Sequence, residues 1–530
     1  MQRKMNHNFL LISGLIISVL SMFGCTEQGT DDRSAVPTEK MLSDSSLLEM
    51  SASEIKPFLS SGRVSVERYM RVLLQHTKGY TPGLNAFIHL DDQAVIAAAK
   101  EADKKRSSNQ QLGALFGIPI GLKDLIVTQG TPTTFGTGTF VGFVPDKNAP
   151  VVTRLLAADA IIFGKNNAQE WAYGSNGYNS HYGQQLNPYD PTRIAGGSSG
   201  GGAAAVSARM LPLAIGSDTA ASIRVPAAYT GLYGFRPSMQ RYDNAGVAPI
   251  APSLDTIGPL ARSIDDLILI DRVLADDPGT VTEIKLTDLR LGVPNSLFYA
   301  DSSVEVQAAF QSVLSRLRKA GVTLIEADLP QVRELTDAGL YAILFYETYP
   351  AVTKFLAEWG DGTKIETLHA NLGWDVKAIW DDLVVPGAAH KTSKADYLHA
   401  LNVLRPQLQQ RYHEYFSEHN VSAIIFPATA TVAPAAKPEN PQGLLVDGKP
   451  ASIYLNDQNS GPGALAGQPG VVIPVSMNQD NLPIAVSLDG KRDQDLELLS
   501  TAKAIASLLT PLASPQKLAQ QRLLTLQVVK

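Results

Sequence analysis

The chain has 530 residues, 44% of them hydrophobic, so it is long enough to bury a large core as one big domain or several ordinary ones. Its formal net charge of −6 argues against a nucleic-acid partner, because binding to phosphates requires a basic surface. The single cysteine excludes an intrachain disulfide, and nine scattered histidines without tight ligand spacing disfavour a metal-dependent hydrolase.

The N-terminal residues have the pattern of a secretory signal. Arg3 and Lys4 precede an apolar run over residues 9–23, which is shorter than the roughly 20 residues of a membrane-spanning helix. The run ends at Gly24-Cys25. A small residue directly before a lone cysteine resembles the cleavage site of a bacterial lipoprotein, so we expect lipidation of Cys25.

This interpretation gives a signal peptide over residues 1–24 and a polar, flexible tether over residues 25–43. Met22-Phe23 departs from the lipoprotein pattern, and the alternative is an ordinary signal with an incidental cysteine. We expect a protein anchored in the bacterial cell envelope, at the periplasmic face of the outer membrane because Thr26 is not aspartate; a soluble periplasmic or secreted protein is the alternative. Lipidation also leaves no cysteine nucleophile.

The first part of the mature chain predicts helices followed by strands. Apolar residues recur at helical spacing over residues 45–105, with an Ala-rich helix over 94–105. Residues 117–127 are rich in Ile and Leu and are bounded by glycine and proline, which predicts a buried strand. A helix over 151–158 and a strand over 160–164 follow.

Short strands alternate with helices in the rest of the chain. We expect a helix over residues 203–209, a strand over 211–218, and further strands that begin near Arg290, Val322, Ser422 and Gly470. This alternation predicts a layered α/β fold. The stretch over residues 331–420 is longer and more helical than the other segments between strands, and it is rich in Trp and Tyr. We therefore interpret it as an insertion packed on the core.

The Gly- and Ser-rich loop over residues 193–205 has several possible roles. It is not a domain linker, because a helix and a strand follow it directly, and it lacks the Gly-Lys-Ser/Thr of a phosphate-binding loop. Gly200, Gly202 and Ala205 match a dinucleotide-binding fingerprint only loosely, because no apolar strand precedes them.

The same loop also matches the nucleophile elbow of an α/β-hydrolase. Residues 196–200 fit the pattern Gly-x-Ser-x-Gly with Ser198 at its centre, which predicts an esterase with a histidine base. An elbow requires a buried strand directly before the serine, and the proline-containing residues 184–193 disfavour one.

A second serine, Ser222, lies in a turn of small residues after the strand over 211–218. A serine needs a base to become nucleophilic at neutral pH. Lys123 is the best candidate, because it stands among apolar residues and burial lowers the pKa of a lysine. A structural lysine paired with Asp124 is the alternative.

Eight segments of the chain, taken in order, resemble the amidase signature family. They are LNAFIHLDDQAV (from Leu84), GIPIGLKDLI (from Gly117), GKNNAQEWAYGSNGYNS (from Gly164), AGGSSGGGAAAVSA (from Ala195), LAIGSDTAASIRVPAAYTGLYGFRPS (from Leu213), GVAPIAPSLDTIGPLARSIDD (from Gly246), FPATATVAP (from Phe426) and LAGQPGVVIPVSM (from Leu465). The resemblance spans about residues 45–509. It implies one large domain over 44–530, with a twisted mixed β-sheet and helices on both faces.

The resemblance also implies a Lys–Ser–Ser triad. Its lysine base is Lys123, its relay serine, held by a cis peptide bond, is Ser198, and its nucleophile is Ser222. The same resemblance implies that Ser199 is a hydrogen-bonding partner of these residues. No cofactor and no metal are implied.

The loop before the nucleophile is expected to form the oxyanion hole with backbone N–H groups, those of Thr219, Ala220, Ala221 and Ser222. Asp218 and Arg224 bracket the nucleophile and are expected to hold this loop. The family usually has Gly-Gly where this chain has Ala220-Ala221. We expect the alanines to leave the site active, because the backbone donors survive and only methyl groups are added.

The resemblance implies hydrolysis of a linear amide, with a small-molecule or peptide amide as substrate. Similar cytoplasmic subunits supply ammonia for tRNA-bound amides, but a signal peptide speaks against that role. Six aromatic residues of the insertion are candidates for an acyl pocket, with ordinary core packing as the alternative for each: Tyr341, Phe345, Tyr349, Trp359, Trp374 and Trp380. A lipoprotein that keeps the scaffold only for binding is the non-enzymatic alternative.

Overall fold

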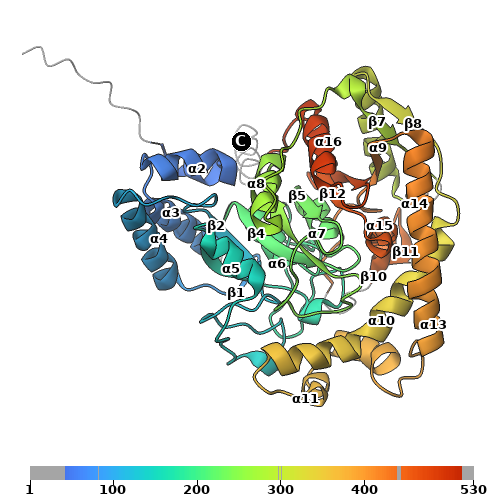
Figure 1. Ribbon diagram of the computed structural model, residues 1–530, viewed down its shortest axis with the longest axis horizontal. Coiled ribbons are helices and arrows are strands. Elements are labelled where there is room, and N and C mark those ends of the chain that lie inside the picture. The colour runs from blue at the N-terminus through green and yellow to red at the C-terminus, as the bar shows by residue number, and fades with distance from the viewer. Residues whose placement is uncertain (1–41, 81–82, 296–297, 300, 438–442, 516–530) are drawn as a thin grey trace, which may run out of the picture. The chain divides into compact units, whose positions relative to one another are not determined.

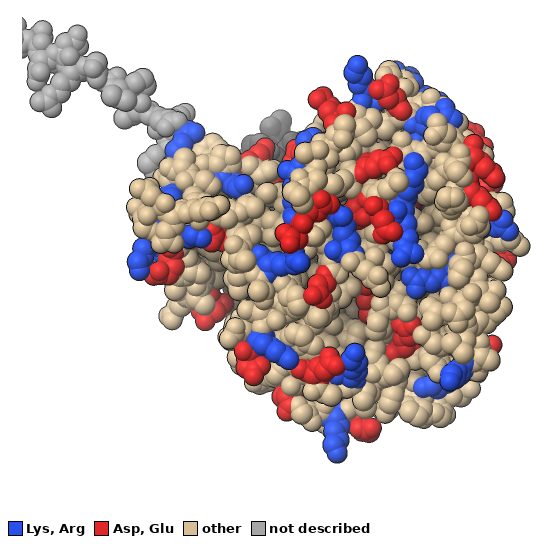
Figure 2. Space-filling model, in the orientation of Figure 1, with Lys and Arg blue, Asp and Glu red and all other residues tan. Residues whose placement is uncertain are grey.

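The computed structural model describes residues 42–80, 83–295, 298–299, 301–437 and 443–515. The expected signal peptide, Cys25 and nearly all of the expected tether lie outside these residues. Over the described ranges, no helix is both long enough and apolar enough to cross a bilayer. Figure 2 shows acidic and basic side chains interspersed over the face in view.

An eleven-stranded sheet forms the centre of the domain (Figure 1). Strands β2, β3 and β4 pair in parallel, as do β7, β8 and β9, whereas the strands between these groups pair antiparallel. In spatial order the strands are β1 (Phe87–His89), β3 (Ile161–Asn166), β2 (Pro119–Lys123), β4 (Leu213–Asp218), β6 (Thr256–Ala261), β5 (Tyr233–Arg236), β12 (Gly470–Met477), β13 (Pro483–Gly490), β9 (Ala423–Pro427), β7 (Arg290–Gly292) and β8 (Thr323–Ile325). The sheet is therefore mixed, as expected.

Helices cover both faces of the sheet, which explains why β2, β4, β6, β9 and β13 are buried along their whole length. Helices α6 (Gly200–Ser207) and α7 (Arg224–Thr230) pack on one face. Helices α8 (Ile264–Ala275) and α16 (Asp495–Leu508) lie side by side on the other (Figure 1).

Helix α6 contains only small residues and one valine, and it packs very closely on its neighbours. A Cβ atom added to Gly201 would lie 2.3 Å from the backbone oxygen of Asn167. The glycines of this loop therefore serve close packing next to Ser198 and Ser199.

The remaining helices lie around this core. They are α1 (Asp44–Glu49), α2 (Ala52–Ser61), α3 (Val66–Gly79), α4 (Asp92–Ser107), α5 (Pro150–Ala157) and α9 (Val304–Lys319). Side chains cap the starts of α1, α2, α3 and α4. Ser51 and Glu54 form a capping box at α2, and the carboxylate of Asp91 accepts two backbone N–H groups at α4.

Every regular element between residues 331 and 420 is helical. The helices are α10 (Val332–Trp359), α11 (Ile365–Ala370), α12 (Trp374–Ile379), α13 (Lys394–His399) and α14 (Arg405–His419), with π-helical turns at Trp380–Val384 and Ala400–Leu404. Helices α10 and α14 pack on α15 (Gly461–Ala466). Near it, β10 (Gly443–Val446) and β11 (Lys449–Ser452) form a separate hairpin.

Two expected element boundaries were wrong. Strand β2 ends at Lys123 instead of residue 127, because the chain turns there: the N–H of Ile126 donates to the carbonyl of Lys123 at 3.0 Å. Helix α6 spans 200–207 instead of 203–209, because Arg209 adopts a φ of 63° and ends it. Strands β1, β5, β6, β10, β11 and β13 were not among the expected elements.

Candidate active site

Lys123 is the last residue of β2, and its ammonium group is buried within the protein at 1% exposure. Its Nζ atom donates to the Oγ atom of Ser198 at 2.6 Å and to the Oγ atom of Ser217 at 2.9 Å. The peptide bond between Gly197 and Ser198 is cis. Two of the three residues of the expected triad are thus in direct contact.

Burial lowers the pKa of Lys123 to about 7, although the carboxylates of Asp218 and Asp255 act in the opposite direction. An ammonium group in water has a pKa of about 10.4. Near neutral pH a large fraction of Lys123 is therefore unprotonated and able to accept a proton.

Ser222 lies in the loop that connects β4 to α7, next to the loop that carries Ser198. The backbone N–H of Ser199 donates to the carbonyl of Ser222 at 3.2 Å. The hydroxyl of Ser199 donates to the carbonyl of Ser217 at 3.2 Å. Gly216 permits this contact, because a Cβ atom there would lie 2.6 Å from the Ser199 Oγ atom. Ser199 therefore joins the loop that carries Ser198 to the loop that carries Ser222.

A buried charge cluster fixes the shape of the nucleophile loop. The carboxylate of Asp218 accepts hydrogen bonds from the guanidinium groups of Arg224 and Arg236, each with a contact of 3.0 Å, and from the backbone N–H of Ile223 at 3.1 Å. Arg224 also donates to the carbonyl of Ala220 at 2.6 Å. Burial alone would raise the pKa of Asp218, but the two arginines outweigh it and hold the pKa below its usual range.

The backbone N–H groups of residues 219–222 have no protein acceptor in the described part of the chain. Four free donors next to a serine are suited to binding an oxyanion. Neither Ala220 nor Ala221 has a positive φ, so both adopt backbone angles that any residue tolerates. The Ala-Ala sequence therefore imposes no left-handed strain on this loop.

Ser222 opens into a cavity of about 360 Å³, which we call the Ser222 cavity. Ala220 and Ala221 lie at its floor beside Ser222. Its walls are largely apolar and come from distant parts of the chain: Ile250, Tyr341, Leu344, Phe345, Ile379, Leu383 and Tyr454. A serine beside free backbone donors at the end of an apolar cavity is an arrangement suited to acyl transfer.

Known proteins share both the sequence and the fold of this chain. The family model described as Amidase matches residues 68–499. A mandelamide hydrolase of Pseudomonas putida is 32% identical over 477 residues, which cover 87% of this chain and 92% of that protein. The chain belongs to the amidase family. An indoleacetamide hydrolase of Rhizobium radiobacter is 33% identical over 425 residues, which cover 80% of this chain and 89% of that protein.

A solved crystal structure of an amidase superposes on this one with a TM-score of 0.76 at 26% identity, covering 87% of this chain and all of that one. The protein is thus an amidase with the expected α/β fold. The esterase alternative is also disfavoured by geometry, because residues 184–197, directly before Ser198, form no strand and its hydroxyl contacts a lysine instead of a histidine.

The aromatic residues of the insertion divide into two groups. Tyr341 and Phe345 line the Ser222 cavity and stack with ring centroids 5.7 Å apart. The other four candidates do not line the Ser222 cavity. Tyr349 contacts Glu366, Trp359 packs against Lys147, Trp374 is 56% exposed beside Tyr178, and Trp380 is buried against Tyr173.

Several residues of this amidase's site were not among the sequence candidates. They are Ser217, Arg236, Asp255 and Asp457. Asp457 lines the Ser222 cavity, and burial raises its pKa to about 7, although the nearby Ser175 hydroxyl opposes the shift. Ser217 directly precedes Asp218, so strand periodicity alone could have suggested that it points away from the Asp218 cluster.

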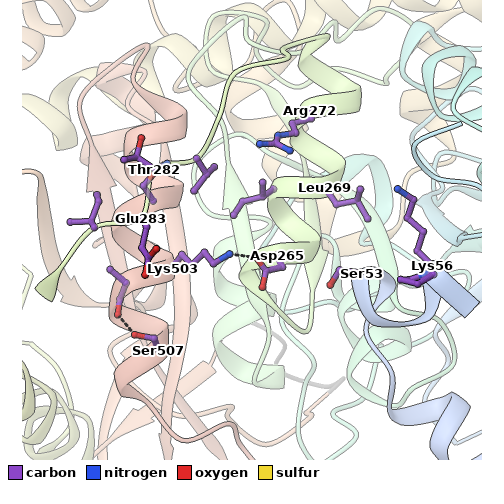
Figure 3. A pocket seen from close by; sticks show the side chains of 15 residues that line it. Ser53, Lys56, Asp265, Leu269, Arg272, Thr282, Glu283, Lys503 and Ser507 are labelled. Atoms are coloured by element: carbon purple, nitrogen blue, oxygen red, sulfur yellow. Dashed lines mark hydrogen bonds and ion pairs between the residues drawn. The ribbon is translucent and has the colours of Figure 1, made fainter. Parts of the chain in front are cut away.

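A larger cavity, of about 730 Å³, lies away from this chemistry (Figure 3). It is bounded by α2, α8, α16 and residues 281–284. Lys503 of α16 forms an ion pair with Asp265 of α8 at 2.6 Å across it. None of the triad residues lines this cavity, so it is not part of the active site. The described residues also contain no group of three or more His, Cys, Asp and Glu side chains able to hold a metal ion.

Proposed function

We propose that this amidase hydrolyses small amides whose acyl group carries an aromatic or other apolar substituent, through a Ser222 acyl-enzyme. The observation that carries the proposal is the apolar Ser222 cavity, with its stacked Tyr341 and Phe345. The names of the two relatives support it, because mandelamide and indoleacetamide are both amides with an aromatic acyl group.

The first chemical step follows from the hydrogen-bonded lysine. Neutral Lys123 accepts a proton from Ser198, which in turn accepts the proton of Ser222. The Ser222 oxygen attacks the amide carbon, and the carbonyl oxygen becomes an oxyanion. Free backbone N–H groups of residues 219–222 stabilise that charge, and each oxyanion donor contributes roughly 3 kcal/mol.

The second step breaks the C–N bond. Ser198 donates its proton to the amide nitrogen and is reprotonated by Lys123, so the amine leaves neutral and Ser222 keeps the acyl group. A water molecule then attacks the ester, with the same proton relay acting in reverse, and releases the acid.

Substitution of each triad residue tests this mechanism. We expect Ser222→Ala to abolish hydrolysis of phenylacetamide, mandelamide and indoleacetamide, and Ser198→Ala and Lys123→Ala each to reduce it by several orders of magnitude, because the three act as one unit. Unfolding curves would verify that each variant is folded. A folded variant with the turnover of the wild type would refute the assigned role, and faster hydrolysis of acetamide than of the aryl amides would refute the substrate class.

We further propose that the protein is attached to the cell envelope through a lipid on Cys25. The support is the sequence pattern alone, in which Gly24-Cys25 closes the apolar run of residues 9–23. Mass spectrometry of the mature N-terminus after expression in a bacterium is the test. A diacylglyceryl-modified Cys25 is expected, and an unmodified cysteine or cleavage at another residue would refute the anchor.

A further inference from the structure

Asp255 lies directly before β6, and the reaction described above does not use it. Its carboxylate joins two loops that contribute Thr219 and Ile250 to the Ser222 cavity. The Oδ1 atom accepts the hydroxyl of Thr219 at 2.6 Å. The Oδ2 atom accepts the backbone N–H groups of Ile250 and Ala251, both at 2.9 Å. Both oxygens of the carboxylate are therefore hydrogen-bonded.

The register of the sheet brings Asp255 to Thr219. Asp218 pairs with Thr256 across the antiparallel strands β4 and β6. Thr219 and Asp255 are the next residues beyond this pair, so they lie opposite each other. Strand β4 ends at Asp218, and Thr219 begins the loop that leads to Ser222. The hydrogen bond from the Thr219 hydroxyl therefore holds the chain where it leaves the sheet.

The loop over residues 219–222 is thus held at both ends. At its far end the N–H of Ile223 donates to the carboxylate of Asp218, and Arg224 donates to the carbonyl of Ala220. At its near end Thr219 donates to Asp255. An oxyanion donor acts only within a narrow range of distance, about 2.7–3.1 Å. The free N–H groups of this loop need such fixed ends to stay within that range.

Asp255 is itself held in place at several points. Its carbonyl accepts the side-chain amide of Asn244 at 2.8 Å, and its N–H donates to the carbonyl of Ala251 at 2.9 Å. Two residues earlier, Ser253 donates its N–H and its hydroxyl to the carboxylate of Glu347 at 2.9 and 2.6 Å. Glu347 belongs to α10, the helix that also supplies the aromatic wall of the Ser222 cavity. A group that is held this firmly can fix the position of its partner.

From these contacts we infer that Asp255 is a positioning residue for the hydrolysis. It holds Thr219, and through Thr219 the backbone donors of residues 219–222, where the oxyanion of the transition state forms. Asp255 acts through another residue and exchanges no proton with the substrate. This inference rests on the proposed function.

Removal of the Thr219 hydroxyl tests the inference. Valine has the shape of threonine without the hydroxyl, whereas Thr219→Ser keeps this donor. Thr230→Val is the matched control, because the hydroxyl of Thr230 is also buried, donates to the carbonyl of Pro226 at 2.7 Å and lies outside the Ser222 cavity. We would measure kcat and KM for phenylacetamide in the wild type and in these three variants.

We expect Thr219→Val to lower kcat about tenfold and to change KM less than about twofold, because displaced oxyanion donors weaken binding of the transition state more than binding of the substrate. Thr219→Ser should recover most of the lost kcat. Thr230→Val should leave kcat unchanged. A loss in Thr230→Val equal to that in Thr219→Val, or a change confined to KM, would overturn the inference.

A double-mutant cycle shows whether Asp255 acts through Thr219. In the Asp255→Ala background, the further change Thr219→Val is expected to lower kcat less than about twofold, because the partner of the hydroxyl is already absent. The full tenfold loss in that background would overturn the inference and leave the proposed function intact.

Absence of hydrolysis of phenylacetamide, mandelamide and indoleacetamide by the wild type would instead contradict the proposed function. Crystal structures of the wild type and of Thr219→Val then decide the inference, and they also decide it if Asp255→Ala does not fold. A displaced loop over residues 219–222 is expected in the variant. An unchanged loop would overturn the inference.

Discussion

As the proposed base, Lys123 sets the pH dependence that we expect of the reaction at the scale of single residues. Its pKa of about 7 means that it is protonated at lower pH and cannot accept the proton of Ser198. We therefore expect kcat/KM to rise about tenfold per pH unit well below pH 7 and to be constant above pH 7. A pH–rate profile on phenylacetamide measures this.

Asp457 has a pKa in the same range, so the profile needs a control. Asp457→Asn removes that titration and leaves Lys123 in place. If the lysine is responsible, the variant keeps the acidic limb of the profile. Loss of the limb in Asp457→Asn would assign it to the carboxyl group instead.

Ala220 and Ala221 allow a second prediction at this scale. Because neither residue has a positive φ, glycines at these positions relieve no strain. We expect Ala220→Gly combined with Ala221→Gly to change the rate of Ser222 labelling by a fluorophosphonate less than about tenfold, which corresponds to about 1.4 kcal/mol. A natural protein that fails to react, beside a double-glycine variant that reacts readily, would contradict this.

Helix α10 supplies the aromatic wall of the Ser222 cavity at the scale of elements. We expect Phe345→Ala to lower kcat/KM for phenylacetamide relative to acetamide about tenfold, because it removes apolar contact with the ring. Tyr349→Ala is the matched control, since Tyr349 stands one turn further along the helix and outside the cavity. Equal selectivity losses in both variants would argue against a role of Phe345 in substrate binding.

The loop between β4 and α7 depends on its buried ion pairs. Arg236→Met leaves Asp218 with one guanidinium partner instead of two, and we expect the free energy of unfolding to fall by about 3 kcal/mol. Arg333→Met, which removes an exposed ion pair with Asp301, should change it by less than about 1 kcal/mol. Urea unfolding curves would measure both, and equal losses would refute this account of the loop.

At the scale of the whole molecule, the alternation of strands and helices was enough to predict an α/β fold. Strands with uninterrupted apolar runs, such as β12, were expected where they occur. Strand β6 was missed because Thr256–Ala261 contains Gly-Pro, and β5 because it has only four residues. Position within a buried sheet, and not local preference, makes these segments strands.

The motifs of the family were enough to predict the three triad candidates. The residues that surround them could be identified only from the fold. Asp457 reaches the Ser222 cavity from 235 positions further along the chain, and no local pattern marks it. Arg236 meets Asp218 because β5 and β4 both pair with β6. Such contacts depend on strand order and register, which the sequence alone does not provide.

Reaction with a fluorophosphonate, followed by peptide mapping, tests the central claim most directly. A nucleophilic Ser222 activated through Ser198 and Lys123 predicts a single adduct on Ser222, none in Ser222→Ala, and labelling at least a hundredfold slower in Lys123→Ala. An adduct on Ser198, no adduct at all, or equal labelling of Lys123→Ala and the wild type would contradict the account.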